Sequence, residues 1–342
     1  MDRGKKALMS STVNIVSQVV TMICGFILPR LILSHFGSSY NGITASVTQF
    51  LSVVSLLRAG VGGATRAALY KSLAKGDFAQ VSATIRATEI FMRRVAVIFL
   101  AVIAGFSLLY PYLVRNEFSW GFAASLVLII SLSTFIQYFF GITFQIRCQA
   151  DQRQYVTTSL EIVAVIVNTA LAALLIHLGV GIHGVKLGSA VAYSITPIGL
   201  NILARRQYKL DPKAKPDFSS ISQRWDSFFH YLAGFIHENT DIALLTVFTN
   251  TREISVYTVY YLVGNGLKNV MHTMTVGVES AFGNIIANHE DDVLHRDVTH
   301  FETLLHASCG VLFSAALVLI TPFIQVYTKG VTDVDYTRYA FG

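Results

Sequence analysis

Three basic residues lie inside long apolar segments of the sequence, where a charge is unfavourable. Arg30 lies in "GFILPRLILSHFG", Arg58 directly precedes "AGVGGA", and Lys268 lies in "VGNGLKNV". A charged side chain at the centre of a bilayer costs about 2.5–3.5 kcal/mol on insertion scales, so such residues usually face a polar cavity or each other. We therefore expect all three to line a cavity. The alternatives are that Arg30 extends to the interface near Gly37 and that Lys268 forms a structural ion pair.

Other polar residues recur at helical spacing, so that each set shares one face of a helix. Residues of this kind face a bundle interior or a water-filled cavity, and the alternative for His and Asn is hydrogen bonding between helices. A carboxylate near Lys268 could pair with it when bare and could no longer do so when it holds H⁺ or Na⁺. The sequence therefore predicts that an ion gradient is coupled to a change in the pairing of Lys268. The predicted coupling residues are Asp241, Glu279, His237 and His272, and the predicted cavity-lining residues are Asn14, Gln18, Thr21, His230 and Asn265.

The elements that position these residues are predicted to be transmembrane helices. The chain has 342 residues, of which 53% are hydrophobic and 13% are charged, whereas soluble domains carry about 25% charged residues. A helix needs about 20 largely apolar residues to cross the hydrocarbon. The predicted fold is an all-α, polytopic, two-lobe helix bundle with about nine spans, at 8–34, 43–70, 95–114, 118–146, 155–179, 184–204, 227–249, 254–286 and 301–327.

Charge and composition also predict the topology and the division of the chain. Most of the 26 lysines and arginines fall on the side of the N-terminus when the spans alternate, and cytoplasmic loops carry such an excess. The N-terminus is therefore predicted to be cytoplasmic. The polar stretch 205–226, with the prolines of "DPKAKP", is predicted to be a cytoplasmic linker between a six-helix lobe at 1–204 and a partial second lobe at 227–342.

Several function classes find no support in the sequence. It contains no P-loop, GxSxG or HExxH motif, so no enzyme activity, cofactor or metal site is predicted. The three cysteines are far apart and form no CxxC pair. The net charge of +6 comes from short loops between apolar segments, which is a membrane pattern and does not predict nucleic-acid binding.

Three stretches carry a resemblance to a known family: "ILPRLILSHFGSSYNGITASVTQFLSVVSLLRAGVGGATRAALYKSLAKGD", "NTDIALLTVFTNTREISVYTVYYLV" and "TPFIQVYTKGVTDVDY". The sequence resembles the Wzx-like oligosaccharide-lipid flippases of the bacterial polysaccharide transporter family, within the multidrug/oligosaccharidyl-lipid/polysaccharide exporters. Family members usually have more spans, so a truncated chain is expected. In related lipid II flippases, basic residues of the first, second and eighth helices line a cationic cavity. The matching residues are Arg30, Arg58 and Lys268, although Lys268 lacks the guanidinium fork that binds phosphate.

The resemblance implies a flippase of the bacterial cytoplasmic membrane. Its substrate would be a polyprenyl-pyrophosphate-linked oligosaccharide, such as an O-antigen repeat of lipopolysaccharide, moved to the outer leaflet by alternating access. Membrane lipid, H⁺ or Na⁺, and polysaccharide polymerase or assembly proteins are the implied partners. Two alternatives stay open, a cation-coupled multidrug exporter, whose cavity should be acidic or aromatic, and a membrane glycosyltransferase or ligase, which should have a larger outer loop.

Overall fold

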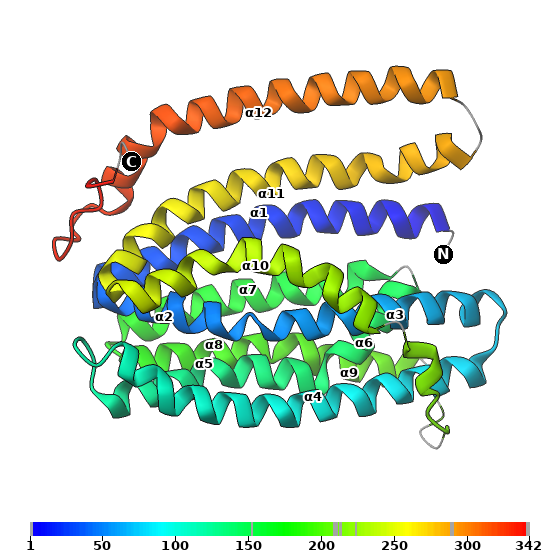
Figure 1. Ribbon diagram of the computed structural model, residues 1–342, viewed down its shortest axis with the longest axis horizontal. Coiled ribbons are helices and arrows are strands. Elements are labelled where there is room, and N and C mark those ends of the chain that lie inside the picture. Colours follow the sequence, from blue (N-terminus) through cyan, green and yellow to red (C-terminus); the bar gives the residue numbers. More distant parts are fainter. Residues whose placement is uncertain are drawn as a thin grey trace. The chain divides into compact units, whose positions relative to one another are not determined.

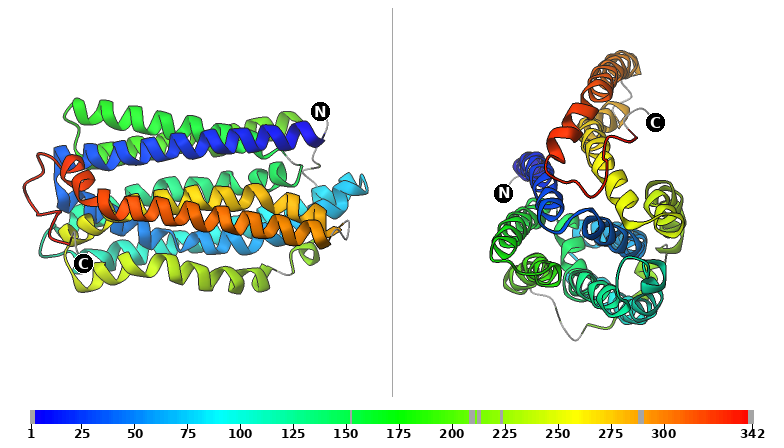
Figure 2. Two further views of the ribbon diagram at one scale, coloured as in Figure 1. Left: turned by 90° about the horizontal axis from the view of Figure 1, so that it is seen from above. Right: turned by 90° about the vertical axis from the view of Figure 1, so that its left-hand side faces the viewer.

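The computed structural model describes residues 3–151, 153–207, 211, 214–222, 224–287 and 291–339, and within these ranges it contains helices and turns but no strand. The chain divides by its contacts into two compact units, residues 1–255 and 256–342. Figures 1 and 2 show the helices of the first unit running side by side along one direction. The helices are α1 (Arg3–Phe36), α2 (Ser38–Leu51), α3 (Val54–Ala74), α4 (Phe78–Leu113), α5 (Trp120–Phe140), α6 (Ile142–Ala150), α7 (Gln154–His177), α8 (Ile182–Tyr193), α9 (Ile195–Gln207), η1 (Phe218–Ile221), α10 (Arg224–Phe248), α11 (Thr251–Ala287) and α12 (Asp291–Tyr327).

Each of the nine predicted spans coincides with helical structure, but three of them are broken. Span 43–70 divides into α2 and α3 at Ser52, span 118–146 into α5 and α6 at Gly141, and span 184–204 into α8 and α9 at Ser194. The Ser194 hydroxyl donates to the Ala190 carbonyl at 2.7 Å, a side-chain bond that competes with the helix ladder and often bends helices. Pro29 lies inside α1, which continues beyond it to Phe36.

Among the residues that the structure describes, four helical segments are long and apolar enough by themselves to cross a membrane: Met9–Phe36, Phe78–Leu113, Gln154–His177 and His295–Tyr327. The shorter apolar helix Trp120–Ile136 belongs to the broken span. Large apolar side chains such as Leu109 on α4 and Leu317 on α12 are strongly exposed, at 68% and 80%. Side chains of this kind contact lipid in a membrane helix, and they would be unfavourable at a surface facing water.

The core of the first unit lies between α2, α3, α4, α5 and α6. Ile43, Val47, Leu69, Met92 and Leu126 are each no more than 2% exposed there. A second apolar cluster joins α1 to α7 and α8 through Leu28, Leu31, Ala172, Ile176 and Val185. α10 packs against α2 and α3, so the seventh predicted span lies in the first unit.

The stretch 70–94 is a helical hairpin, whereas the sequence predicted a long basic loop. α3 continues to Ala74 and α4 begins at Phe78. Gly76 takes the left-handed backbone conformation that the tight turn requires, at φ 69°. The Asp77 side chain then accepts a hydrogen bond from the Gln80 backbone N–H at 2.9 Å, which caps α4. Basic residues in this hairpin therefore project from helices.

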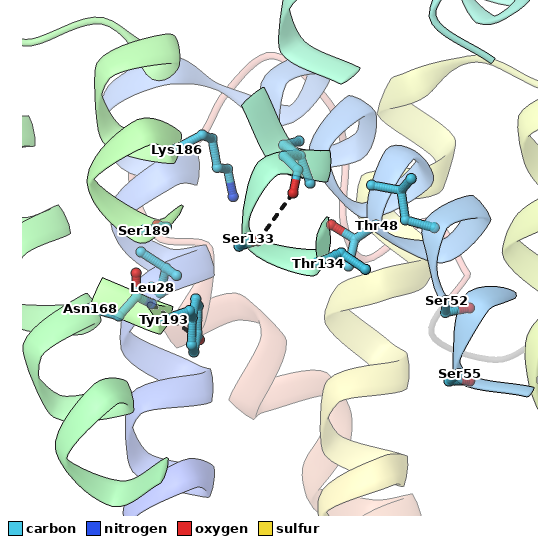
Figure 3. Close-up of a pocket in the computed structure, with 12 residues that line it drawn as sticks. Leu28, Thr48, Ser52, Ser55, Ser133, Thr134, Asn168, Lys186, Ser189 and Tyr193 are labelled. Carbon is cyan, nitrogen blue, oxygen red and sulfur yellow. Dashed lines mark hydrogen bonds between the residues drawn. The ribbon is translucent and has the colours of Figure 1, made fainter. Parts of the chain in front are cut away.

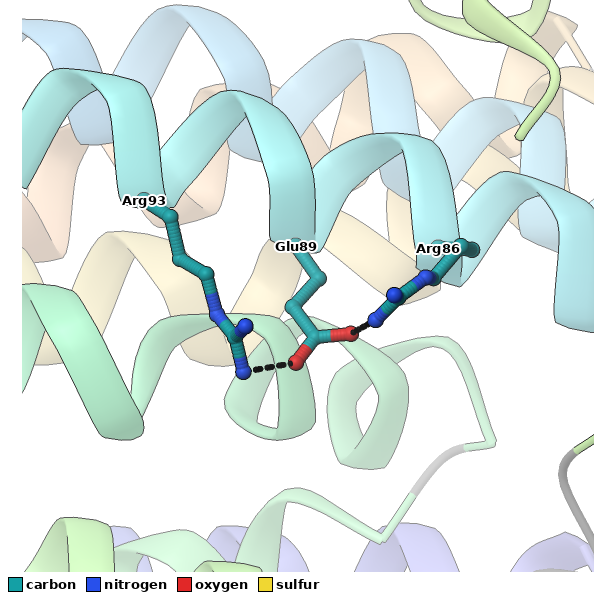
Figure 4. Close-up of polar contacts among 3 residues, drawn as sticks. All are labelled: Arg86, Glu89 and Arg93. Atoms are coloured by element: carbon teal, nitrogen blue, oxygen red, sulfur yellow. Dashed lines mark hydrogen bonds and ion pairs between the residues drawn. The ribbon is translucent and has the colours of Figure 1, made fainter. Parts of the chain in front are cut away.

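On the surface of α4, Glu89 accepts hydrogen bonds from Arg86 at 2.8 Å and from Arg93 at 2.7 Å (Figure 4). All three side chains are partly exposed, and pairs of this kind contribute only about 0–1 kcal/mol to stability. Their spacing of three and four residues places them on one face of the helix. This face carries positive charge at the end of the unit where the linker also packs.

Part of the predicted linker packs against this hairpin. Asp217 accepts a hydrogen bond from Gln80 at 2.6 Å, and its backbone N–H donates to the Ala83 carbonyl at 3.2 Å. Ile221 in η1 is fully buried, and the Arg94 guanidinium lies 5.8 Å from the centre of the Phe218 ring. The described part of the linker is therefore held by specific contacts with α3 and α4.

Candidate functional site

A cavity of about 470 Å³ lies within the first unit (Figure 3). Its volume falls in the range of about 300–1,000 Å³ that is typical of small-molecule sites. Nine of the twelve described lining residues have polar side chains, and none of them is Asp or Glu. The lining residues come from α1, α2, α3, α5, α7 and α8 and from the break between α2 and α3: Leu28, Thr48, Leu51, Ser52, Ser55, Ile130, Ser133, Thr134, Asn168, Lys186, Ser189 and Tyr193.

Lys186 is the charged residue among the described lining residues of this cavity. It lies four residues after the start of α8, which is about 6 Å along the helix axis at 1.5 Å per residue. Figure 3 shows its side chain extending from α8 toward the space beside Ser133. Lys186 makes no ion pair or hydrogen bond with a residue that the structure describes. The cavity therefore contains an ammonium group whose charge no described carboxylate neutralises.

Asn168 and Tyr193 form a polar pair in the wall of the cavity. The Asn168 side-chain amide donates to the Tyr193 hydroxyl at 3.3 Å. Asn168 is only 2% exposed, and its Oδ1 is buried without a hydrogen-bond partner. Because a buried acceptor without a partner is unfavourable, this oxygen indicates a site for a donor from a ligand or water. The Tyr193 O–H keeps its own hydrogen available for donation.

Four hydroxyl groups of the lining already use their hydrogens. They donate to the carbonyl three or four residues earlier in their own helix, from Ser133 to Ile130 (3.1 Å), Ser189 to Val185 (3.2 Å), Thr48 to Thr44 (2.7 Å) and Ser52 to Gln49 (2.6 Å). A hydroxyl has one donor and two acceptor lone pairs. These oxygens therefore present acceptors to the cavity, and the lining is rich in acceptors.

The break between α2 and α3 contributes directly to the cavity wall. Ser52 and Ser55 lie at this break and line the cavity. Irregular backbone at membrane depth occurs where it lines a cavity or is buried in protein. Gln49 and Ser52 both donate to the Asn239 side-chain oxygen, at 2.6 and 3.2 Å, which attaches this part of the wall to α10.

Arg30 and Lys268, two of the residues predicted to bind the anion, are not among the described lining residues of this cavity. Arg30 is half-buried on α1, two residues after Leu28. Two residues turn a helix by about 200°, so Arg30 and the cavity residue Leu28 point to opposite sides of α1. Arg58 belongs to α3 and Lys268 to the second unit, where it is exposed. The side chain of Arg58 lies outside the described ones. A shared cationic cavity of these three residues stays a prediction.

The predicted coupling residues are divided between the two units. His237 and Asp241 are exposed on α10, and His272 is exposed on α11 in the second unit. The side chain of Glu279, also in the second unit, lies outside the described ones. The buried face of α10 carries Thr246 and the partly buried Asn239 instead. The coupling role of these residues therefore stays a prediction. On α10, His237 and Asp241 lie on the face that does not pack against α2.

The residues predicted to line a cavity take several positions. Asn14 accepts a hydrogen bond from Thr158 of α7 at 3.1 Å, which is the contact between helices that the sequence left as its alternative. Gln18 and Thr21 are exposed, and Asn265 is partly buried in the second unit. The side chain of His230 lies outside the described ones. None of the four described ones is among the described lining residues of the cavity of the first unit.

Sequence reasoning missed Lys186, Asn168, Ser189 and Tyr193 as one site. Lys186 lies near the start of the predicted span 184–204, just after the short turn "GVGIHG", and was not among the residues predicted to line a cavity. A signal was nevertheless present, since Lys186, Ser189 and Tyr193 are spaced by three and four residues and share one helix face. A basic residue inside a predicted span is the same pattern from which Arg30 and Lys268 were predicted to line a cavity.

Comparison with solved structures places this fold. The crystal structure of a MATE transporter in the bent conformation is similar to this chain, with a TM-score of 0.59 and 12% identity. The similar region covers 97% of this chain and 76% of that transporter. The inward-facing structure of a multidrug resistance MATE family transporter of the MOP superfamily matches 94% of the chain with 77% of its own length, at a TM-score of 0.60 and 12% identity. The eukaryotic MATE transporter AtDTX14 matches 99% of the chain with 77% of its own length, at 0.56 and 14%.

The chain has the fold of the MATE transporters. It is an all-helical, multi-pass membrane protein, as the sequence predicted. At 12–14% identity the likeness is one of fold. No family model and no curated protein matches the sequence.

Proposed function

We propose that this protein is a membrane transporter that moves an anionic, lipid-linked oligosaccharide from the cytoplasmic to the outer leaflet by alternating access. The observation that carries the proposal is the cavity of the first unit, which holds the Lys186 ammonium and no carboxylate among the lining residues that the structure describes. An organic cation would be repelled by this charge, whereas an anion would be attracted. The MATE-like fold supports a transporter rather than an enzyme.

The pyrophosphate of the substrate is assigned to the cationic residues of the apolar segments. Arg30 and Arg58 can each offer a planar fork of donors to phosphate oxygens, and Lys268 can add a point charge. Their charges would replace the hydration that the pyrophosphate loses inside the bilayer. The polyprenyl chain would stay in lipid while the polar head crosses.

Coupling to an ion gradient is assigned to Asp241 and Glu279, with His237 and His272 nearby in the sequence. A carboxylate that holds H⁺ or Na⁺ leaves Lys268 available for phosphate, and a bare carboxylate competes for it. The proposed location is the bacterial cytoplasmic membrane with the N-terminus in the cytoplasm, where polysaccharide polymerase or assembly proteins would receive the product.

A second candidate function is an ion-coupled multidrug exporter. The solved structures of this fold favour it, since one of them is described as a multidrug resistance transporter. The two candidates differ in the charge of the substrate. An exporter of organic cations needs acidic or aromatic groups in its cavity, so Lys186 would have to be irrelevant to its transport.

Reconstituted protein can separate the two candidates. Proteoliposomes would be tested for movement of a fluorescent polyprenyl-pyrophosphate-linked oligosaccharide and for uptake of a fluorescent organic cation. We expect movement of the lipid-linked sugar only, its loss in Arg58→Ala and its partial return in Arg58→Lys, because lysine keeps the charge without the fork. Cation uptake without movement of the lipid-linked sugar would replace the proposal with the exporter. Equal activity of Arg58→Ala and the parent would remove Arg58 from the mechanism.

A further inference from the structure

The cavity of the first unit has an unusual balance of donors and acceptors. The oxygens of Ser133, Ser189 and Thr48 present lone pairs because their hydrogens are used within their own helices. Asn168 adds the unpartnered Oδ1. Against these acceptors stand the Lys186 ammonium, the Tyr193 hydroxyl and the hydroxyls of Ser55 and Thr134, which make no hydrogen bond to a residue that the structure describes.

A ligand that complements this lining must carry many hydroxyl donors and one negative group. Sugar hydroxyls can donate to the serine and threonine oxygens and to Asn168. One carboxylate can pair with Lys186, in a charge-assisted hydrogen bond that is stronger than a neutral one. The ring of Tyr193, which is 42% exposed, offers an apolar surface with a polar tip.

Pyrophosphate fits this lining poorly. It carries several negative charges and its oxygens are acceptors, so it needs several cationic donors. Among its described lining residues the cavity offers a single ammonium, and the acceptor oxygens there would repel phosphate oxygens. An organic cation fits no better, because no described lining residue carries a negative charge.

We infer that this cavity is a subsite for an acidic sugar, a saccharide unit with one carboxylate, in which Lys186 binds the carboxylate and the hydroxyl and amide oxygens bind the sugar hydroxyls. The inference rests on the proposed function, because the acidic sugar is taken to be part of the oligosaccharide that the transporter moves. It assigns the saccharide and the pyrophosphate to different residues. The repeat unit carried by this protein therefore contains an acidic sugar.

Binding of small sugars to the purified 342-residue chain in nanodiscs tests the inference. The probes are a glucuronic acid–glucose disaccharide, its neutral glucose–glucose counterpart and inorganic pyrophosphate, measured by calorimetry. We expect the acidic disaccharide to bind about tenfold more tightly than the neutral one, because a charge-assisted hydrogen bond is stronger than a neutral one. Lys186→Met should remove this difference, because the preference for the carboxylate depends on the ammonium.

Control variants keep the result interpretable. Lys75→Met removes a lysine from the exposed turn between α3 and α4 and should leave all binding as in the parent. Ser133→Ala should weaken both disaccharides, because it removes an acceptor that the two share. Retained binding of the neutral disaccharide by Lys186→Met shows that this variant is folded.

Three outcomes would overturn the inference. They are equal affinity of the parent for the two disaccharides, an unchanged preference in Lys186→Met, and pyrophosphate binding that exceeds sugar binding and depends on Lys186. A separate assay of lipid-linked oligosaccharide movement distinguishes this inference from the proposed function. If the parent moves no such lipid while Lys186-dependent sugar binding persists, the proposed function fails and the subsite stands. If movement occurs without any Lys186-dependent preference, the subsite fails alone.

Discussion

Gln49 of α2 donates from Nε2 to the side-chain oxygen of Asn239 on α10, at 2.6 Å. The same oxygen accepts from Ser52 at 3.2 Å, at the break between α2 and α3. Two helices separated by almost 200 positions in the sequence are thus joined beside the cavity wall. Small polar residues that bond across helices are a typical means of association in membranes.

Replacing Gln49 or Asn239 should destabilise the first unit. Gln49→Leu and Asn239→Leu should each lower the unfolding free energy by about 0.5–2 kcal/mol, the range for hydrogen bonds between membrane helices. The double variant should be more stable than the sum of the two losses predicts, because both partners are then apolar. Denaturant unfolding in detergent micelles measures this cycle. Strictly additive losses would show that the two side chains do not interact.

The Tyr110 hydroxyl should contribute to the stability of the first unit. It is fully buried and donates to Ser46 at 3.0 Å, and Ser46 lies 2.8 Å from Thr246. Thr246 gives its hydrogen to the Ile242 carbonyl at 2.7 Å, so Ser46 must donate to Thr246 and accept from Tyr110. Tyr110→Phe should lower stability by about 1 kcal/mol. Tyr112→Phe is the matched control, because Tyr112 is 62% exposed. Thermal unfolding of both variants gives the comparison, and equal melting temperatures would contradict it.

Gly42 should tolerate no side chain. A Cβ at this position would overlap the Thr251 backbone carbonyl at the start of α11. Backbone cannot move aside as a flexible side chain can, so Gly42→Ala should cost more than the 1–3 kcal/mol or so of ordinary overpacking. At Gly105 on α4 nothing lies within 4 Å, and Gly105→Ala should instead be neutral or stabilise by about 0.5–1 kcal/mol. Monodispersity and melting temperature in detergent would compare the two, and a well-folded Gly42→Ala would disprove the close approach.

The sequence predicted where the helical segments lie, because about 20 apolar residues in a row are a strong local signal. It did not predict the breaks at Ser52, Gly141 and Ser194. A single small residue barely changes the mean hydropathy of a span, and the break depends on local hydrogen bonds such as that from Ser194 to Ala190. The same local geometry brings Ser52 and Ser55 into the cavity wall.

Periodicity also showed which residues share a face, but not which face is buried. On α10 it grouped His237 with Asp241, and the structure packs Asn239 and Thr246 against α2. The choice depends on partners such as Gln49 and Ser46, which lie far away in the sequence. Lys186 was missed for a related reason. A count of charges loop by loop assigns a lysine in the first part of a helix to the loop before it.

The topology can be tested by labelling single cysteines in a background where Cys24, Cys148 and Cys309 are replaced. Lys75 and Asp333 are both exposed, at the turn between α3 and α4 and after α12. The excess of basic residues on the side of the N-terminus places Lys75 in the cytoplasm, and nine spans place Asp333 outside. A membrane-impermeant maleimide should therefore label Asp333→Cys in intact cells and label Lys75→Cys only after lysis. Labelling of Lys75→Cys alone in intact cells would invert the orientation.

Acid should release the linker from the hairpin of α3 and α4. The hydroxyl of Ser219 and the amide of Gln80 donate to Asp217, at 2.5 and 2.6 Å, and hold the pKa of its carboxyl below the ordinary value of 3.8. Hydrogen bonds of this kind favour the ionised form. The contribution of Asp217 is therefore complete above the ordinary pKa and is lost as the pH falls below that value through the lowered one.

Limited proteolysis with pepsin, which works in this pH range, can follow the release. In the parent, cleavage near Phe218 should accelerate as the pH falls below the ordinary carboxyl pKa. Asp217→Asn cannot ionise, so its cleavage should already be fast at the upper end of that range and should change little with pH. Asp333→Asn is the control, since Asp333 is exposed after α12 and lies far from the linker in the sequence; it should behave as the parent does. If Asp217→Asn kept the parent's pH dependence, another group would have to hold the linker.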